Sequence, residues 1–145
     1  MKFLKHVLLF FLAVWELPQN LAGLAVLVFM KRKGGVLKTE TGNHRIFIET
    51  KGTGVSLGSF VFWTKAGNRF PHLVNDCRMH EYGHTIQSAL LGPAYLVLIG
   101  IPSLARVFYR RWYRKKYGMG WENYYKGYPE NWADRLGGVT ANKKK

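Results

Sequence analysis

Cysteine is almost absent from the sequence, in which Cys77 is the one thiol among 145 residues. A single thiol excludes an internal disulfide, and it excludes a zinc cluster built from thiolates. Cys77 falls on the core-facing side of a predicted helix, where a free cysteine usually acts as a small buried residue. We therefore expect Cys77 to belong to the core.

Acidic residues are also scarce, with 8 Asp plus Glu against 22 Lys plus Arg and a formal net charge of +14 at pH 7. Such an excess indicates an anionic partner, either lipid headgroups or nucleic acid. The basic residues cluster directly after apolar segments, at residues 31–33 and 106–116. That placement is typical of cytoplasmic membrane flanks, so it favours anionic lipid over nucleic acid.

The sequence lacks an uninterrupted apolar run long enough to cross a bilayer. Residues 3–30 are mainly apolar, but the polar stretch 16–20, with Pro18 inside it, divides them into halves that are each too short for a core of about 30 Å. A small-residue cleavage site is missing, which argues against a signal peptide. The segment either spans as one kinked helix or dips in and returns, and its polar break must face protein, water or headgroups.

A second apolar segment, residues 94–105, contains Gly100 and Pro102 and leads into a tract of mixed basic and aromatic residues that ends near Tyr117. Such mixtures suit a membrane interface, and they can also stack on single-stranded nucleic acid. Because the tract directly follows an apolar segment, residues 93–117 are expected to form a re-entrant or interfacial element.

Alternating apolar residues at 44–50 and 55–63, separated by a Gly-containing turn at 51–54, predict a β-hairpin at the edge of a small sheet. A helix is expected to begin between Pro71 and Asp76 and to end at Gly92-Pro93. A last helix is expected from about Pro129 to Leu136, before two glycines.

Residues 80–84 read His-Glu-Tyr-Gly-His, an HExxH motif on the first of these helices. A helical step of four places the imidazoles of His80 and His84 on one side, where both can reach one metal ion. Glu81, one step round, can then act as general base on a zinc-bound water, whose pKa falls from about 16 towards 7. Two core histidines in ordinary hydrogen bonds are the alternative, which the apolar setting and the uncharged intervening residues disfavour.

A catalytic zinc needs a third protein ligand and leaves its fourth position to water. The metzincin pattern requires Gly at position 87 and His at position 90, so Gln87 and Leu90 exclude it. Glu130 and Asp134 fall one turn apart on the last helix, where one can bind zinc while the other accepts the N–H of a ligand histidine. A solvated acidic face is the alternative for this pair. With the metzincin pattern excluded, five residues are candidates for the third ligand: His44, His72, Glu122, Glu130 and Asp134.

HExxH followed by ExxxD resembles the gluzincin metallopeptidases, above all the membrane-bound CAAX-prenyl endopeptidases and HtpX proteases. Their downstream motif commonly reads Glu-x-x-Ala-Asp-Arg, as residues 130–135 do here. Residues 80–103 are also similar to small bacterial membrane proteins with a zincin core. The resemblance implies that His80, His84 and Glu130 are the zinc ligands. It also implies that Glu81 is the general base and that Asp134 is the partner of a ligand histidine.

Peptide hydrolysis also needs a donor for the oxyanion and a surface for an extended substrate. Tyr124, Tyr125 and Tyr128 lie near Glu130 in the sequence, and a phenol from this cluster is a candidate donor. Packing or interfacial roles are equally good explanations for these tyrosines. In zincins the strand before the HExxH helix offers an exposed edge, here residues 55–63, to which a peptide can add as a further strand.

These observations predict an α+β fold with a zincin-like domain over residues 34–140, a membrane-anchoring segment over residues 1–33 and a basic tail over residues 141–145. The expected function is that of a zinc endopeptidase acting on peptide or protein substrates at the cytoplasmic side of a bacterial membrane. The alternative is a membrane-anchored binding or regulatory protein that holds zinc without catalysis. Nucleic acid is not the expected partner.

Overall fold

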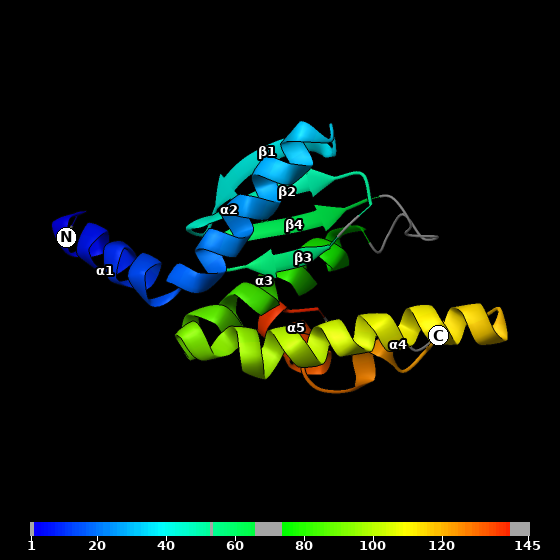
Figure 1. Cartoon of the computed structure of the whole chain (residues 1–145). Helices are drawn as coiled ribbons and strands as arrows, with labels where there is room; N and C mark the ends of the chain where they lie inside the picture. The colour runs from blue at the N-terminus through cyan, green and yellow to red at the C-terminus, as the bar shows by residue number, and fades with distance from the viewer. Residues whose placement is uncertain (1, 53, 66–73, 140–145) are drawn as a thin grey trace.

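The computed structural model describes residues 2–52, 54–65 and 74–139, and it has an α+β fold (Figure 1). Its sheet has four strands in the order β1-β2-β4-β3. β1 pairs antiparallel with β2, β2 runs parallel to β4, and β3 pairs antiparallel with β4. The strands are β1 (Val36–Gly42), β2 (Arg45–Thr50), β3 (Val55–Leu57) and β4 (Phe60–Thr64).

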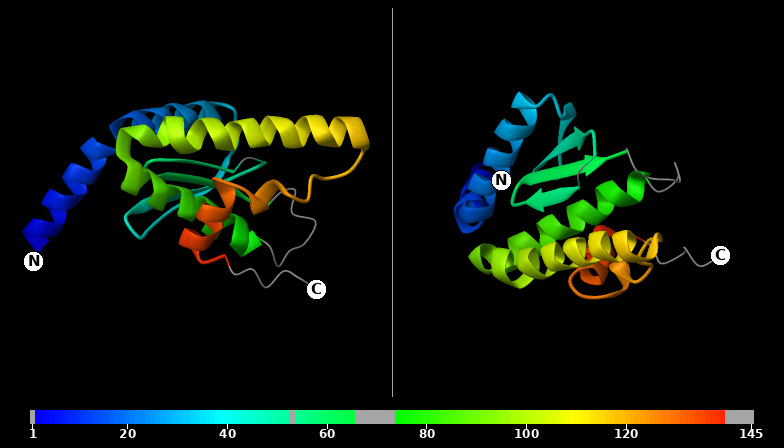
Figure 2. Two further views of the ribbon diagram at one scale, coloured as in Figure 1. Left: turned by 90° about the horizontal axis from the view of Figure 1, so that it is seen from below. Right: turned by 45° about the vertical axis from the view of Figure 1, so that its right-hand side comes forward.

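Helices cover both faces of this sheet. α2 crosses one face and α3 packs on the other, with α4 and α5 beyond α3 (Figures 1 and 2). This arrangement confirms the expected fold class, including an HExxH helix packed on a C-terminal helix. The helices are α1 (Lys2–Trp15), α2 (Leu17–Arg32), α3 (Val74–Leu91), η2 (Gly92–Ala94), η3 (Leu96–Gly100), α4 (Ile101–Tyr117), η4 (Tyr124–Lys126) and α5 (Glu130–Gly137).

The expected pairing of residues 44–50 with residues 55–63 as one hairpin is wrong. β2 and β4 run parallel, and Gly58, whose φ is +58°, turns the chain so that residues 55–63 themselves form the β3–β4 hairpin. β2 instead forms a hairpin with β1, a strand that the sequence analysis did not predict. Asn43 and His44 make the two-residue turn with φ values of 50° and 60°, as this tight type of hairpin turn requires.

Alternation along the two central strands builds a layer on each side of the sheet. Phe47, Val61 and Trp63 form a buried cluster that packs on Cys77 and Tyr82 of α3, so Cys77 contributes to the core as expected. The neighbouring positions point to the opposite face, which α2 covers. This core fixes α3 against the sheet with the HExxH motif in its middle turns.

The polar break between the apolar N-terminal helices is buried against the rest of the protein. Glu16 forms an ion pair with Arg45 at 2.6 Å, and the Gln19 amide donates to the Gly92 carbonyl oxygen at 2.6 Å. In the described part of the chain no single helix is long and apolar enough to cross a membrane. Residues 6–15 and α2 would suffice together, but they are bent by 82°.

Residues 96–117 form a continuous helical segment, in which the π-helical η3 leads directly into α4. Pro102 in the first turn of α4 has no backbone N–H to donate, and the Leu98 carbonyl oxygen four residues earlier accepts the Tyr128 hydroxyl at 2.6 Å instead. Gly118 ends the helix with a φ of +71°. Gly100 and Pro102 therefore do not interrupt this segment.

Candidate metal centre

The candidate site lies where α3 and α5 cross at very short range. A Cβ atom at Gly83 would collide with the Ala133 carbonyl oxygen, and one at Gly137 would collide with the Met79 carbonyl oxygen. Glycine at both positions lets the two helix backbones touch. The crossing brings the first residue of α5, Glu130, against the histidines of the middle turns of α3.

Three buried side chains meet at this crossing. The Glu130 Oε2 atom lies 3.0 Å from His80 Nε2 and 3.4 Å from His84 Nε2. One donor atom from each of the three residues lies within 4.8 Å of the other two, so the group could hold a metal ion. Two histidines and a glutamate form a donor set that catalytic zinc sites use.

The partner of each imidazole fixes which of its nitrogens carries the proton. His80 Nδ1 lies 2.7 Å from Asp134 Oδ1, and an ionised carboxylate only accepts, so Nδ1 is the donor. His84 Nδ1 lies 2.8 Å from Gln87 Oε1, while the other end of that amide donates to the Pro129 carbonyl oxygen. When these imidazoles are neutral, each therefore directs the lone pair of Nε2 towards Glu130.

Glu130 adds a third electron-pair donor to the same point. Its Oε1 atom accepts a hydrogen bond of 2.6 Å from Ser103 of α4, whereas Oε2 is buried and accepts no hydrogen bond of regular geometry among the described residues. Three lone pairs facing one another repel unless a cation lies between them. The site thus fits a divalent metal such as zinc.

The pKa values of His80 and Glu130 also indicate that the site favours a positive charge. Burial alone lowers the pKa of the His80 imidazole, but the Asp134 and Glu130 carboxylates, 2.7 Å and 3.0 Å from its two nitrogens, outweigh burial and raise the pKa to about 10. For Glu130 burial raises the pKa, and the adjacent His80 and His84 imidazoles reverse this and hold the pKa well below the usual range. A proton meets part of this demand for charge, and a metal ion would meet more of it.

Glu81 is buried beside the three donors and is held from the sheet. The Ser56 hydroxyl on β3 lies 2.8 Å from Glu81 Oε2 and 2.7 Å from the Glu81 carbonyl oxygen, and it can donate to either. The Tyr95 hydroxyl donates to the Ser56 carbonyl oxygen at 3.0 Å. Burial, only partly offset by His80, His84 and the Ser56 hydroxyl, raises the pKa of the Glu81 carboxyl.

The three candidate oxyanion donors differ in how they are engaged. The Tyr128 hydroxyl donates to the Leu98 carbonyl oxygen at 2.6 Å, and the buried Tyr124 ring lies under the Arg110 guanidinium at 4.9 Å. The Tyr125 ring stands edge-on to His80 with centroids 5.1 Å apart. Of the three, Tyr125 is thus the one whose ring contacts a candidate ligand.

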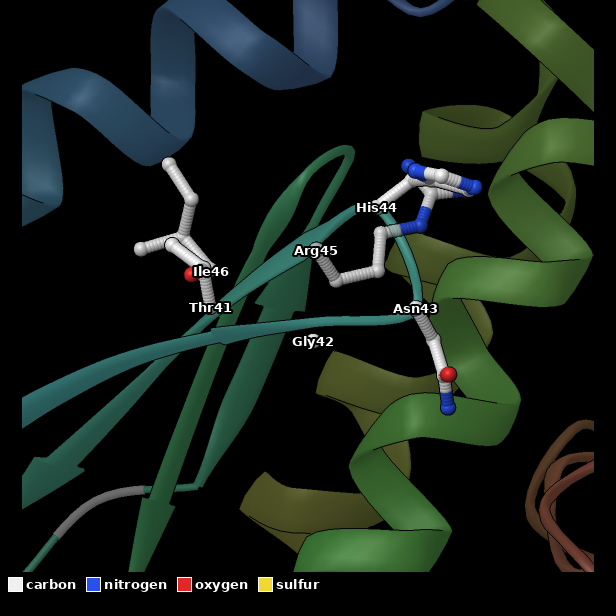
Figure 3. A pocket seen from close by; sticks show the side chains of 6 residues that line it. All are labelled: Thr41, Gly42, Asn43, His44, Arg45 and Ile46. Atoms are coloured by element: carbon white, nitrogen blue, oxygen red, sulfur yellow. The ribbon is translucent and has the colours of Figure 1, made fainter.

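The other candidate ligands do not join the group. His44 lies in the β1–β2 turn and lines a separate pocket, shown in Figure 3 together with Arg45 and Asn43. Glu122 is exposed in the loop before η4. His72 lies outside the described residues. Asp134 contacts the far nitrogen of His80 rather than the point where the three donors meet.

Sequence reasoning missed the roles of Gln87, Ser56 and Ser103. Gln87 entered only as evidence against a metzincin, although its position three residues after His84 places both on neighbouring turns of one helix face. That spacing could have identified it as a partner of His84. Ser56 and Ser103 carry no comparable local signal, because their contacts to Glu81 and Glu130 depend on tertiary packing.

Residues 55–63, which were expected to form an exposed edge of the sheet, do so only in part. β3, over residues 55–57, is an edge strand beside Glu81, whereas β4 lies between β2 and β3. Of residues 55–63, only the β3 part therefore lies at a sheet edge where a peptide could pair.

No protein-family model matches the chain, and neither a curated protein nor a solved structure was found that matches it. The functional assignment therefore depends on the geometry of the site itself.

Proposed function

We propose that this chain is a membrane-associated zinc metallopeptidase in which His80, His84 and Glu130 hold the metal. The observation that carries the proposal is the convergence of three buried donor atoms within 4.8 Å of one another. The resemblance of the HExxH and ExxxD motifs to gluzincins supports the same conclusion. Zinc bound there would acidify a water molecule and polarise the substrate carbonyl group.

The protein's own residues supply positioning and proton transfer. Asp134 and Gln87 keep the imidazoles in the tautomer that leaves Nε2 free. Glu81 takes a proton from the attacking water as the new carbon–oxygen bond forms, and it gives that proton to the leaving nitrogen as the carbon–nitrogen bond breaks. The Ser56 hydroxyl holds the Glu81 carboxylate in place for both transfers.

An extended peptide lying along β3 would pass beside Glu81. This strand is at the sheet edge, and its residue Ser56 already contacts the Glu81 carboxylate. The Tyr125 phenol would donate to the oxyanion. Both large basic clusters follow apolar helical stretches, which supports a proposed location at the cytoplasmic surface of a bacterial membrane.

The test is to measure zinc per chain and peptide hydrolysis in detergent for the parent and four variants. We expect about one zinc in the parent and in Glu81→Gln, and much less in His84→Ala and Glu130→Ala. Glu122→Ala is the matched control, because it removes an exposed glutamate from the same part of the chain. Hydrolysis of an unstructured protein should be lost in Glu81→Gln and kept in Glu122→Ala.

Different outcomes refute different parts of the proposal. Full zinc occupancy in Glu130→Ala would disprove its role as third ligand, and a parent without zinc would disprove the site. Zinc binding with no hydrolysis in the parent, unchanged in Glu81→Gln, would identify the alternative, a zinc-holding binding or regulatory protein.

A further inference from the structure

Large apolar side chains are exposed on two parts of the fold. They lie on α1 and α2 and on the helical segment of residues 96–108, and examples are Phe10, Phe11, Leu21, Leu24, Ile101 and Leu104. α2 and α4 run along the same side of the molecule, with α3 and α5 behind them (Figure 2). Exposed apolar surface of this extent on elements along one side of the molecule indicates an interaction site.

Buried contacts fix the bend between α1 and α2. The Glu16–Arg45 ion pair, the Gln19 hydrogen bond to Gly92 and a bond from the Trp15 indole N–H to the Ala89 carbonyl oxygen all hold it. Straightening the pair into one membrane-spanning helix would break these contacts. The bend of 82° is therefore part of the fold.

Neither helix can cross a bilayer separately. α1 has 14 residues, about 21 Å of helix, against a hydrocarbon core of about 30 Å. α2 is pressed onto the sheet, since a Cβ atom at Gly23 would lie 2.9 Å from the Leu57 carbonyl oxygen, and the Asn20 side chain accepts the Ser59 N–H at 2.7 Å. One side of α2 thus contacts protein while the other is exposed.

Basic residues follow the apolar part of each exposed helix. Lys31 and Arg32 occupy the last turn of α2, and Arg114, Lys115 and Lys116 occupy the last turn of α4. Trp112 and Tyr109, which suit the headgroup region, precede the second cluster on α4 and are exposed. This pattern is complementary to an anionic lipid surface, which offers apolar chains below negative headgroups.

We propose that α1, α2 and residues 96–108 form one docking face that lies in a single leaflet of an anionic bilayer, without crossing it. The proposal goes beyond peptidase activity, because it concerns how the chain meets the membrane. It places both ends of the α1–α2 pair at the same bilayer surface. It also places α4, whose Ser103 hydroxyl contacts Glu130, directly on the lipid.

The first test is flotation with sealed vesicles. Binding to vesicles of phosphatidylcholine with phosphatidylglycerol should be strong, and binding to phosphatidylcholine alone should be weaker. Replacing Arg114, Lys115 and Lys116 by glutamate should weaken binding to the anionic vesicles about 100-fold. Ile101→Asp with Leu104→Asp should abolish it, while Leu37→Asp, an exposed apolar position on β1 outside the docking face, should not.

The second test separates docking from crossing. Cysteines at positions 2 and 33, introduced together in a Cys77→Ala background, are labelled with a membrane-impermeant maleimide in sealed proteoliposomes. In-plane docking predicts two labels on each chain that faces outward and none on each chain that faces the lumen. A spanning pair predicts one label per chain, and this result would overturn the proposal.

Two other occupants of the face would be recognised in the same experiments. A stable dimer that forms without detergent and no longer binds vesicles would identify a second copy of the chain. Salt-dependent binding to single-stranded RNA that persists in Ile101→Asp with Leu104→Asp, together with no preference for anionic vesicles, would identify nucleic acid. Either result would overturn lipid docking.

Discussion

Gly83, inside the HExxH motif, controls the distance between α3 and α5, and its replacement by alanine should weaken zinc binding. A Cβ atom there would lie 2.7 Å from the Ala133 carbonyl carbon and 3.0 Å from the Gly137 nitrogen. Non-bonded carbon contacts lie at about 3.5–4.0 Å, so the helices must separate by roughly 1 Å. Metal–ligand distances tolerate only about 0.2 Å. We expect zinc affinity to fall about 10-fold to 100-fold.

The stability of the metal-free protein should also fall, by a free energy of the same order. Overpacking costs about 1–3 kcal/mol, and alanine regains about 1 kcal/mol of helix propensity over glycine. The net loss in the free energy of unfolding is therefore at most about 2 kcal/mol. Zinc affinity is measured by competition with a chromogenic chelator, and stability by thermal unfolding in excess chelator.

Gly100→Ala is the matched control for this prediction. Gly100 is also a helical glycine, but its nearest neighbours to an added Cβ atom lie at 3.9 Å, in ordinary contact. This variant should keep the zinc affinity of the parent and gain up to about 1 kcal/mol in stability. If Gly83→Ala binds zinc as tightly as Gly100→Ala, the close helix crossing does not set the geometry of the site.

Two further variants test buried polar contacts. Gln87→Leu should lower zinc affinity about 10-fold to 100-fold in the chelator competition, because the Nδ1 proton of His84 loses its acceptor; an unchanged affinity would contradict this role. Arg45→Met should cost about 3–5 kcal/mol in thermal unfolding, because Glu16 would remain buried without its partner. The double variant with Glu16→Leu should be more stable than Arg45→Met alone, and a simple sum of two losses would contradict a coupled pair.

The parts of the site that could be predicted from sequence are those fixed by one helix. The spacing of His80 and His84 places two imidazoles on one face whatever the rest of the fold, and the spacing of Glu130 and Asp134 does the same for two carboxylates. The residues alone left five candidates for the third ligand, and the gluzincin resemblance selected Glu130. The α3–α5 crossing brings that side chain to the two histidines. That crossing depends on Gly83 and Gly137, whose close contact has no signature in either helix alone.

The sheet was harder to predict because its pairing is long-range. Residues 38–41 of β1 read Lys-Thr-Glu-Thr and are mostly exposed, so they offer no apolar alternation. Two alternating segments joined by a turn predict a hairpin, yet β4 inserts between β2 and β3. Gly58 and the Asn43-His44 turn decide this arrangement through their positive φ values. Composition alone could not rank these turns above the one at 51–54.

Ser103 joins the proposed docking face to the proposed metal site, because this residue of α4 donates a 2.6 Å hydrogen bond to Glu130 Oε1. If lipid holds α4 in place, anionic vesicles should tighten zinc binding by the parent protein. Linkage then requires zinc to tighten vesicle binding by the same factor. Ser103→Ala should weaken zinc binding up to about 10-fold and should reduce the effect of vesicles.

The hydroxyl group itself is tested by Ser103→Thr, which keeps the donor and should preserve the vesicle effect. Zinc affinity is measured for all three proteins with and without vesicles of phosphatidylcholine and phosphatidylglycerol, and vesicle binding is measured with and without zinc. An equal vesicle effect in the parent and in Ser103→Ala would show that the coupling does not run through this hydrogen bond. No effect in the parent would show that docking and metal binding are independent, and both proposals would then stand separately on their own tests.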